Sequence, residues 1–396
     1  MKISIIGSGI MGATLARLFA SEGHFVSVCE RNDTAGGLCE DLFVPGDGVK
    51  SYRAKHGPHI FHTSNEKVWS FVNKYEQFIP YDHKVVSVTN DGIIPWPIND
   101  VTLKLAFNCD DTKEARRLWE EDKTETRRIV FGGDGIFDDD TFEKTMLLQV
   151  GKKLYSMFIY EYTRKHWRKF PADIPAELAN RVRVNESESG SYYFYEKYVA
   201  IPRHGYTAFV EALLMHPRIH VYTNLNIYNG LITKLLNESD LVFNTGMITD
   251  ILEKPEEEYL RVRNEFKSVS SLSIPNEVLE GFMVGYIVVN DCTSISKATR
   301  YTYYGGLYEA LGITDKEGFV PNALVPMVGI EKPTEDGEPL YPVRTKANIQ
   351  KHNDLIHESF AKYGAKLNHC GRCGSYNYFS MARTIEIAME IVENYR

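Results

Sequence analysis

The chain has 396 residues, of which 43% are hydrophobic and 25% are charged, an ordinary composition for a folded globular protein. Its length indicates two or three domains. Its net charge of −8 argues against general binding of nucleic acid, which needs a basic surface. It has no run of about 18 apolar residues, so we expect no membrane insertion, and the six cysteines, sparse for this length, suggest a reducing, cytoplasmic compartment.

Segment 1–39 combines an apolar run, a glycine turn, a helical stretch and a second apolar run that ends at Glu30. Gly7 permits a tight turn, Gly9 lets the backbone approach a pyrophosphate, and Gly12 allows close packing of the helix on the sheet. The helix N-terminus offers free N–H groups to phosphate, and the Glu30 carboxylate can accept hydrogen bonds from a ribose diol. Because glycines interrupt the apolar start, we interpret it as a dinucleotide-binding strand and not as a signal peptide.

The residues after Glu30 indicate which dinucleotide binds. Arg31 follows at once, and a second glycine pair, Gly36-Gly37, precedes Leu38. This E-R-x(4)-G-G continuation resembles flavoproteins that bind FAD through an N-terminal Rossmann unit, in which the second glycine pair lets the chain pass close to the ribityl phosphate. NAD dehydrogenases usually lack it, so FAD is favoured over NAD.

The pattern changes along the rest of the chain. Segment 81–99 reads as a hairpin around the turn Asn90-Asp91-Gly92. Segment 266–304, rich in Val, Ile, Thr and Tyr, predicts antiparallel strands, and segment 376–396 predicts a final helix that returns to the first domain. Segment 101–167 predicts helices, the best beginning near Asp140 with an apolar stripe at four-residue spacing: Phe142, Met146, Val150, Leu154, Phe158 and Tyr162.

This order of elements predicts an α/β protein with interwoven domains. We expect a Rossmann-like FAD-binding domain with an inserted helical domain and an antiparallel β-sheet domain. The predicted boundaries are 1–62, 200–250 and 344–396 for the FAD-binding domain, 100–178 for the helical domain, and 63–99, 179–199 and 251–343 for the sheet domain.

Two motifs could be mistaken for metal or redox sites. His56, His59 and His62 recur at every third position. A metal site here would need them to converge, with a carboxylate or cysteine nearby, and the loop-like context supplies neither, so we predict no metal. The other interpretation is a buried loop whose imidazoles bond backbone groups. Cys370 and Cys373 have the C-x-x-C spacing of a redox pair or half a zinc site, yet no second such pair exists.

Six segments resemble signature segments of the UDP-galactopyranose mutases. Each is weak alone, but all six occur in the family's order. They are GPHIFHT at 57–63, WPIN at 96–99, YTRKHW at 162–167, PRHGYT at 202–207, EPLYPV at 338–343 and GRCGSYNY at 371–378.

The resemblance implies an isomerase that interconverts the pyranose and furanose forms of a UDP-sugar, such as UDP-galactose, UDP-arabinose or UDP-N-acetylgalactosamine. In that family reduced FAD attacks the anomeric carbon, and a covalent flavin–sugar adduct lets the ring open and reclose. Two alternatives stay open, an FAD-dependent oxidoreductase of the amine-oxidase type and a non-catalytic nucleotide-sugar binder. The sequence does not decide the oligomeric state, and a homodimer is compatible with it.

The resemblance also implies which residues contact the flavin. His62 would lie nearest the reactive ring and is a catalytic candidate. The cofactor-binding candidates are Gly7, Gly9, Ile10, Met11, Gly12, Glu30, Arg31, Gly37, Leu38, His59, Ile60, Arg372 and Met381.

The substrate candidates follow from the same resemblance. Phe158 and Tyr162, one helical turn apart, would stack on the uracil, unless they only belong to the core stripe. Arg300 matches the arginine that grips the pyrophosphate, a task that suits a forked cation. A second catalytic arginine on a mobile loop is expected at Arg183, with Arg181 as the other choice and a solvated surface pair as the alternative. The remaining candidates are Thr163, Trp167, Asn290, Tyr341 and Tyr378.

Departures from the family pattern gather at the sugar and diphosphate end. Ser380 stands where the family has an aspartate, and Leu340 replaces the first tyrosine of E-P-Y-Y. Segment 303–306 replaces an acidic run, and segment 260–263 matches Y-R-S-L only loosely. The sequence therefore predicts the cofactor more sharply than the sugar.

Overall fold

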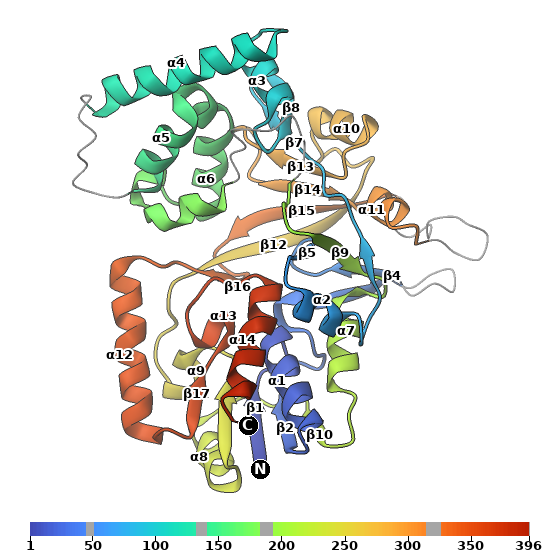
Figure 1. Cartoon of the computed structure of the whole chain (residues 1–396), viewed down its shortest axis with the longest axis vertical. Coiled ribbons are helices and arrows are strands. Elements are labelled where there is room, and N and C mark those ends of the chain that lie inside the picture. The colour runs from blue at the N-terminus through green and yellow to red at the C-terminus, as the bar shows by residue number, and fades with distance from the viewer. Residues whose placement is uncertain (45–50, 132–140, 183–192, 314–325, 396) are drawn as a thin grey trace. The chain divides into compact units, whose positions relative to one another are not determined.

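The structure, a computed structural model, describes residues 1–44, 51–131, 141–182, 193–313 and 326–395 (Figure 1). The chain divides into two compact units. Unit 1 comprises Met1–Tyr81, Glu196–Arg261 and Glu338–Arg396, and unit 2 comprises Asp82–Tyr195 and Val262–Gly337. The three-domain division stays a prediction; the structure places the helical segment and most of the sheet segment together in unit 2. It places four parts of the predicted sheet domain in unit 1: 63–81, 196–199, 251–261 and 338–343.

A five-stranded parallel sheet forms the centre of unit 1. Its strand order is β10-β2-β1-β11-β17, and β1 runs parallel to both β2 and β11. Four of the five residues of β1 are buried, as expected for a strand covered on both faces. The predicted Rossmann-like fold is confirmed. The strands are β1 (Lys2–Ile6), β2 (Phe25–Cys29), β10 (Ile219–Tyr222), β11 (Leu241–Asn244) and β17 (Leu367–His369).

Helices and short strands complete unit 1. The helices are α1 (Ile10–Ser21), α2 (Glu66–Val72), α7 (Gly205–Leu214), α8 (Asn229–Glu238), α9 (Ile248–Leu252), α12 (Lys346–Tyr363), α13 (Gly371–Gly374) and α14 (Met381–Glu393). The other strands are β3 (Asp41–Val44), β4 (Ser51–Ala54), β5 (Phe61–Thr63), β6 (Phe78–Pro80), β9 (Tyr198–Pro202) and β16 (Glu338–Pro342).

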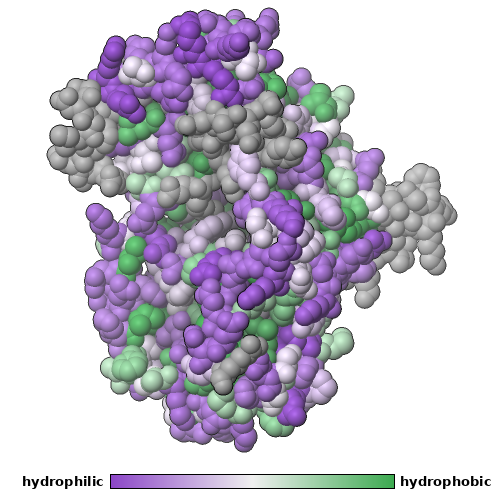
Figure 2. Space-filling model, viewed as in Figure 1, coloured by the Kyte–Doolittle hydropathy of each residue, from purple (hydrophilic) through white to green (hydrophobic). Residues whose placement is uncertain are grey.

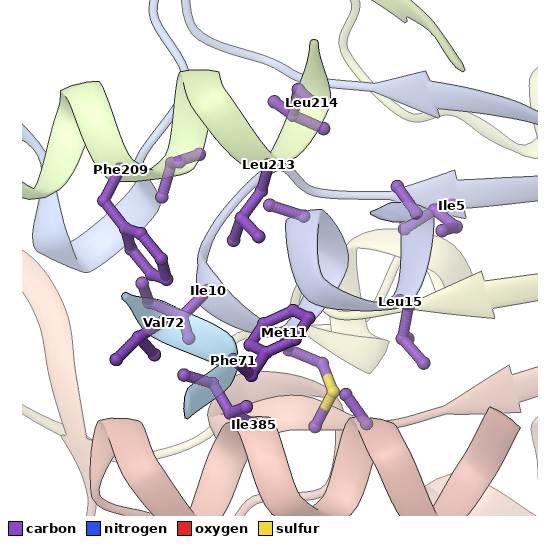
Figure 3. Packing of buried hydrophobic residues seen from close by; sticks show 14 of the residues in the cluster. Ile5, Ile10, Met11, Leu15, Phe71, Val72, Phe209, Leu213, Leu214 and Ile385 are labelled. Carbon is purple, nitrogen blue, oxygen red and sulfur yellow. The ribbon is translucent and has the colours of Figure 1, made fainter. Parts of the chain in front are cut away.

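The main core of unit 1 surrounds α1. Figure 3 shows Met11 of α1 close to Ile385 of α14 and to Phe71 of α2, with Leu213 of α7 also turned toward α1. The predicted final helix is confirmed as α14, and its packing against α1 confirms that the chain returns to the first domain.

Unit 2 contains a mixed sheet in which β12, β15, β14, β13, β7 and β8 are neighbours in that order, with residues 262–268 of β12 in this unit. The hairpin predicted at 81–99 is confirmed as β7 and β8, which pair antiparallel. β14 pairs antiparallel with β13 and β15, whereas β13 runs parallel to β7, so the prediction of an antiparallel sheet is wrong for that pair. The strands are β7 (Val85–Thr89), β8 (Gly92–Trp96), β12 (Tyr259–Ser268), β13 (Val288–Asp291), β14 (Arg300–Tyr303) and β15 (Met327–Thr334).

Segment 266–304 contains a helix that the strand prediction missed. α10 (Asn276–Met283) begins directly after Pro275, which fixes the backbone for a helix start, and α11 (Tyr304–Ala310) follows β14. The apolar face of α10 covers one face of the sheet, where Val278 packs with Val86 and Val289.

The helical part of unit 2 contains the α-helices α3 (Asp100–Ala106), α4 (Thr112–Phe131), α5 (Phe142–Leu154) and α6 (Tyr160–Trp167), and two short 3-10 helices, Pro171–Asp173 and Ala176–Arg181. The charged surface of α4 gives the strongly hydrophilic area at the top of Figure 2, and its Trp119 is 1% exposed. Within the described ranges, none of the helices combines the length and the apolar character that crossing a bilayer requires.

The long helix predicted to run from Asp140 through Tyr162 is wrong in its continuity. Gly151 has φ +77 and ψ 166, which are not helical angles, so the chain kinks there. A side chain at this position would meet Asp122, because a Cβ would lie 2.1 Å from its Oδ2. A π-helical turn, Tyr155–Ile159, then separates α5 from α6. The N-cap is Thr141, whose side chain accepts a hydrogen bond from the backbone N–H of Lys144, while Asp140 lies outside the described residues.

Candidate functional site

The two glycine motifs of unit 1 meet in space. Gly7 has φ +94, Gly9 forms a parallel β-bridge with Gly36, and a Cβ on Gly37 would lie 3.1 Å from Cα of Gly9. Gly9 is also the N-cap of α1 and supplies no capping side chain, so no side chain of the N-cap competes with an anion for the first helical N–H groups. Ile10 and Met11 follow as the first residues of α1. This arrangement fits the pyrophosphate of a dinucleotide.

Glu30 lies at the end of β2 and is held in place by three hydrogen bonds. Its Oε2 accepts hydrogen bonds from the backbone N–H of Ser8 at 2.9 Å and from Ser8 Oγ at 2.7 Å, and its Oε1 accepts one from the Asn32 N–H at 2.9 Å. A carboxylate fixed in this way suits the ribose of a dinucleotide. The sequence did not identify Ser8 as the partner of Glu30, although its place between two motif glycines was the available signal. Arg31 is exposed and pairs with Glu338 at 3.1 Å.

The histidines of the GPHIFHT segment have separate partners. Nε2 of His59 lies 2.7 Å from the Leu38 carbonyl oxygen, and Tyr206 Oη donates a hydrogen bond to the His59 carbonyl at 2.9 Å. Nδ1 of His62, on β5, lies 3.0 Å from Oε1 of Glu196. Through its contact with Leu38, His59 links the second glycine motif to the segment that continues through Ile60 into β5. Among the residues that the structure describes, no group of three or more His, Cys, Asp or Glu is arranged to hold a metal ion.

Arg372 lies over the rings of two tyrosines in unit 1. Its guanidinium carbon is 5.4 Å from the ring centroid of Tyr341 and 4.9 Å from that of Tyr378, and these two rings stack with centroids 5.3 Å apart. Its Nη1 and Nη2 donate hydrogen bonds to the carbonyls of Leu340 and Phe379. Three predicted residues therefore form one cluster, to which Leu340 contributes its backbone carbonyl.

The C-x-x-C motif does not have the properties of a redox pair. Burial raises the pKa of Cys370 to about 12 and that of Cys373 to about 11, so both stay protonated at neutral pH, whereas a reactive cysteine needs the thiolate. A Cβ on Gly371, between them, would lie 3.2 Å from Cβ of Met11, so this segment packs closely against α1.

Ser380, the departure from the family aspartate, is the N-cap of α14, whose first residue is Met381. Its Oγ accepts a hydrogen bond from the backbone N–H of Arg383 at 3.2 Å. Serine and aspartate are equally good N-caps, so the local structure tolerates the exchange.

Ser380→Ala is expected to lower the free energy of unfolding by about 1 kcal/mol, whereas Ser380→Asp should stay within about 0.5 kcal/mol of the wild type, because only alanine removes the cap. Urea unfolding measures both. An aspartate variant as unstable as the alanine variant would contradict the capping role.

Asp41 stands three residues after Leu38 of the second glycine motif and pairs with α7. Its Oδ2 accepts a hydrogen bond from the Thr207 N–H at 3.1 Å, and its own N–H donates to Thr207 Oγ1 at 2.8 Å. Burial raises the pKa of Asp41 to about 6, although the hydrogen bonds from Thr207 and Tyr206 oppose the shift.

A raised carboxyl pKa destabilises the folded protein as the pH rises from about 4 through about 6. Asp41→Asn removes this titration and keeps an acceptor for Thr207. Relative to the wild type, the variant should therefore gain about 2–3 kcal/mol of unfolding free energy between pH 4 and pH 7. Urea unfolding at several pH values measures the gain, with exposed Asp33→Asn as the control. A difference that stays constant with pH would contradict the shift.

Arg300 is the centre of the second group of candidates, which lies in unit 2. Its Nε donates to Asn290 Oδ1 and its Nη2 to Tyr162 Oη, each at 3.4 Å, and its Nη1 lies 3.6 Å from Oε1 of Glu331. Burial raises the pKa of Glu331, and Arg300 opposes the shift. Burial likewise raises the pKa of Tyr162 to about 12. Asn290, Tyr162 and Glu331 thus surround the guanidinium group.

The aromatic candidates near Arg300 differ in their surroundings. Phe158, in the π-helical turn, is 3% exposed and packs with Trp96, as the core interpretation expects. The ring of Tyr162 stacks on that of His166 at 5.7 Å, and the ring of Trp167 meets His166 edge-on. Thr163 is 5% exposed. Arg183 lies outside the described residues, as does the side chain of Arg181.

The sequence did not identify Glu331. A signal was present, because a glutamate at the end of the apolar run Met327–Ile330 is unusual for a buried strand. The sequence could not show that Arg300 is the partner of Glu331, because the pairing depends on the strand register that places Glu331 opposite Arg300 on β14.

Known proteins match the chain over its whole length. The family model described as UDP-galactopyranose mutase matches residues 157–378, and a model described as NAD(P)-binding Rossmann-like domain matches residues 5–75. The dTDP-fucopyranose mutase of Escherichia coli is 31% identical over 401 residues, with 100% of this chain and 98% of the relative covered. A protein of Klebsiella pneumoniae named probable UDP-galactopyranose mutase is 28% identical, with 100% and 94% covered.

The crystal structure of reduced UDP-galactopyranose mutase is similar in fold. It matches with a TM-score of 0.65 and 12% sequence identity, covering 100% of this chain and 95% of the other. At this identity the likeness concerns the fold.

Proposed function

Because the chain belongs to the UDP-galactopyranose mutase family, we propose that it interconverts the pyranose and furanose forms of a nucleotide-linked sugar with FAD in its reduced form. The protein is a flavin-dependent isomerase. Since the relatives' names carry either uridine or thymidine diphosphate, the proposed substrate class is a sugar linked to a pyrimidine nucleoside diphosphate.

The observation that carries the proposal is the extent of the match. A flavin oxidoreductase of the amine-oxidase type would share the Rossmann-like part, whereas the mutase family model covers residues 157–378, which include Tyr162, Asn290 and Arg300. The cluster around Arg300 in unit 2 also has the chemistry of a diphosphate site, because a forked cation that can pair with phosphate oxygens stands between Asn290 and Tyr162.

The residues of unit 1 would hold the cofactor. Gly9 would present the N-terminus of α1 to the pyrophosphate, Glu30 would accept hydrogen bonds from the ribose, and Arg372 with its two tyrosines would lie at the flavin or the diphosphate. When bound and reduced, the flavin would supply the electron pair that displaces the nucleoside diphosphate from the anomeric carbon. His62, oriented by Glu196, would face the flavin.

The residues of unit 2 would hold the nucleotide. Tyr162 would stack on the base, and Arg300 would neutralise the charge that grows on the diphosphate as it leaves, a stabilisation that is strongest where water is excluded. Thr163, Trp167 and Asn290 would line the same site, and the loop arginine Arg183 would add a second cation.

The test is turnover before and after reduction. The FAD-loaded protein is incubated with UDP-galactose, UDP-N-acetylgalactosamine, UDP-arabinose and dTDP-fucose, with and without dithionite, and the products are separated chromatographically. We expect a furanose product from at least one substrate, only after reduction, and no net change in the flavin absorbance.

Other outcomes would support the alternatives. Reduction of the oxidised flavin by a substrate would indicate an oxidoreductase. Binding of the nucleotide sugars without any product from the reduced protein would indicate a non-catalytic binder.

A further inference from the structure

A buried lysine connects three segments of unit 2. Nζ of Lys165, on α6, lies 3.1 Å from Oδ1 of Asp291, at the end of β13, and donates a hydrogen bond to the Ala298 carbonyl at 2.8 Å. The side chains of Lys165 and Asp291 are only 8% and 3% exposed. A single ammonium group thus joins a helix, a strand end and the segment that leads into β14.

The three connected segments carry substrate candidates of unit 2. Lys165 stands two residues after Thr163, Asp291 directly follows Asn290, and Ala298 stands two residues before Arg300. The ammonium group therefore ties the base side, on α6, to the diphosphate side, on β13 and β14.

Further hydrogen bonds stabilise the buried pair of Lys165 and Asp291. Oδ1 of Asp291 also accepts hydrogen bonds from the backbone N–H of Thr293 at 2.9 Å and from Thr293 Oγ1 at 2.7 Å. Burial lowers the pKa of Lys165, and Asp291 opposes that shift. Two charges removed from water persist only when their geometry and additional hydrogen bonds compensate, as they do here.

We propose that Lys165 and Asp291 are positioning residues that hold Tyr162 and Arg300 at the separation at which one nucleoside diphosphate reaches both. This inference rests on the proposed function, because it assumes that the base binds at Tyr162 and the diphosphate at Arg300. Neither Lys165 nor Asp291 needs to touch the nucleotide for this role. When two contacts act on one molecule, their spacing decides the gain over either contact alone.

The experiment compares a whole ligand with its two fragments. Dissociation constants of UDP, uridine and inorganic pyrophosphate are measured by NMR titration of the FAD-loaded wild type and of Lys165→Met. We expect UDP binding to weaken about tenfold or more, because its two contacts no longer fit together, while uridine and pyrophosphate each stay within about twofold.

Two further variants control for charge and for conservative replacement. Lys332→Met breaks an ion pair in the same sheet, with Glu265 at 2.8 Å, whose side chains are 34% and 32% exposed, and should leave all three constants unchanged. Lys165→Arg, which keeps the cation, should recover most of the UDP affinity. If Lys165→Met does not fold, Asp291→Asn takes its place in the same comparison.

The remaining outcomes overturn the inference. Parallel weakening of all three ligands would indicate general disruption of the site, and weakening of pyrophosphate together with UDP would mean that Lys165 binds the phosphate itself. Unchanged UDP binding would also contradict the positioning role. If the wild type binds dTDP and not UDP, the same comparison is made with dTDP, thymidine and pyrophosphate. A wild type that binds neither UDP nor dTDP would contradict the proposed function, and this inference with it.

Discussion

Replacing Arg300 with alanine is expected to lower kcat/KM for the nucleotide sugar by about 10³-fold while FAD stays bound. A guanidinium that pairs with a diphosphate contributes charge-assisted hydrogen bonds of roughly 1.5–3 kcal/mol each, and a tenfold change in rate corresponds to about 1.4 kcal/mol. The loss should be partly softened by Glu331. Its pKa is already raised by burial, and without Arg300 to oppose the shift it takes up a proton more readily.

The matched control for this prediction is Arg164→Ala. Arg164 belongs to the same unit, but it is 43% exposed and pairs with Glu161 on the surface of α6, so kcat/KM should stay within about twofold. Steady-state kinetics and the flavin absorbance of the purified variants measure both effects. Loss of FAD from Arg300→Ala would contradict the placement of this residue at the diphosphate, and an unchanged kcat/KM would contradict its role in turnover.

Elements encoded by local patterns were predictable. The glycine turn, the hairpin around Gly92 and α14 each follow from residue types that lie within a few positions of one another, and the structure has all three. The failures depend on contacts between distant residues. Gly151 kinks the predicted long helix, and just after the kink the Lys153 N–H donates a hydrogen bond to Asp122 of α4. β13 joins β7 in parallel although the two strands are about 200 residues apart in the chain.

The candidate site divides in the same way. The motifs led to Arg300, Tyr162 and Asn290, and the structure brings these three together in unit 2. Glu331 and the Lys165–Asp291 pair were missed because a charged residue's partner depends on strand register and helix placement, neither of which the sequence states. Family signatures show which residue types recur at which positions of the sequence. Strand register and helix placement determine which of these residues are in contact.

Replacing Gly12 with alanine is expected to abolish stable FAD binding and to lower the free energy of unfolding by about 3 kcal/mol. A Cβ at this position would lie 2.0 Å from the Gly7 carbonyl oxygen and 3.2 Å from Cγ2 of Ile5. The first contact is to backbone, so no side chain can rotate away, and α1 must move off β1. That movement would displace Gly9, which presents the start of α1 to the pyrophosphate.

The control is Gly230→Ala in the first turn of α8, in the same unit. The nearest atom to its new Cβ would be Cε2 of Tyr228, at 3.0 Å, on an exposed side chain that can turn aside. Alanine favours a helix by up to about 1 kcal/mol over glycine, so this variant should keep its flavin and its stability. The flavin-to-protein absorbance ratio after gel filtration and the Tm measure both variants. Full flavin content in Gly12→Ala would show that α1 can move away from β1 without loss of the cofactor. The close approach of α1 to β1 at Gly12 would then not be required for FAD binding.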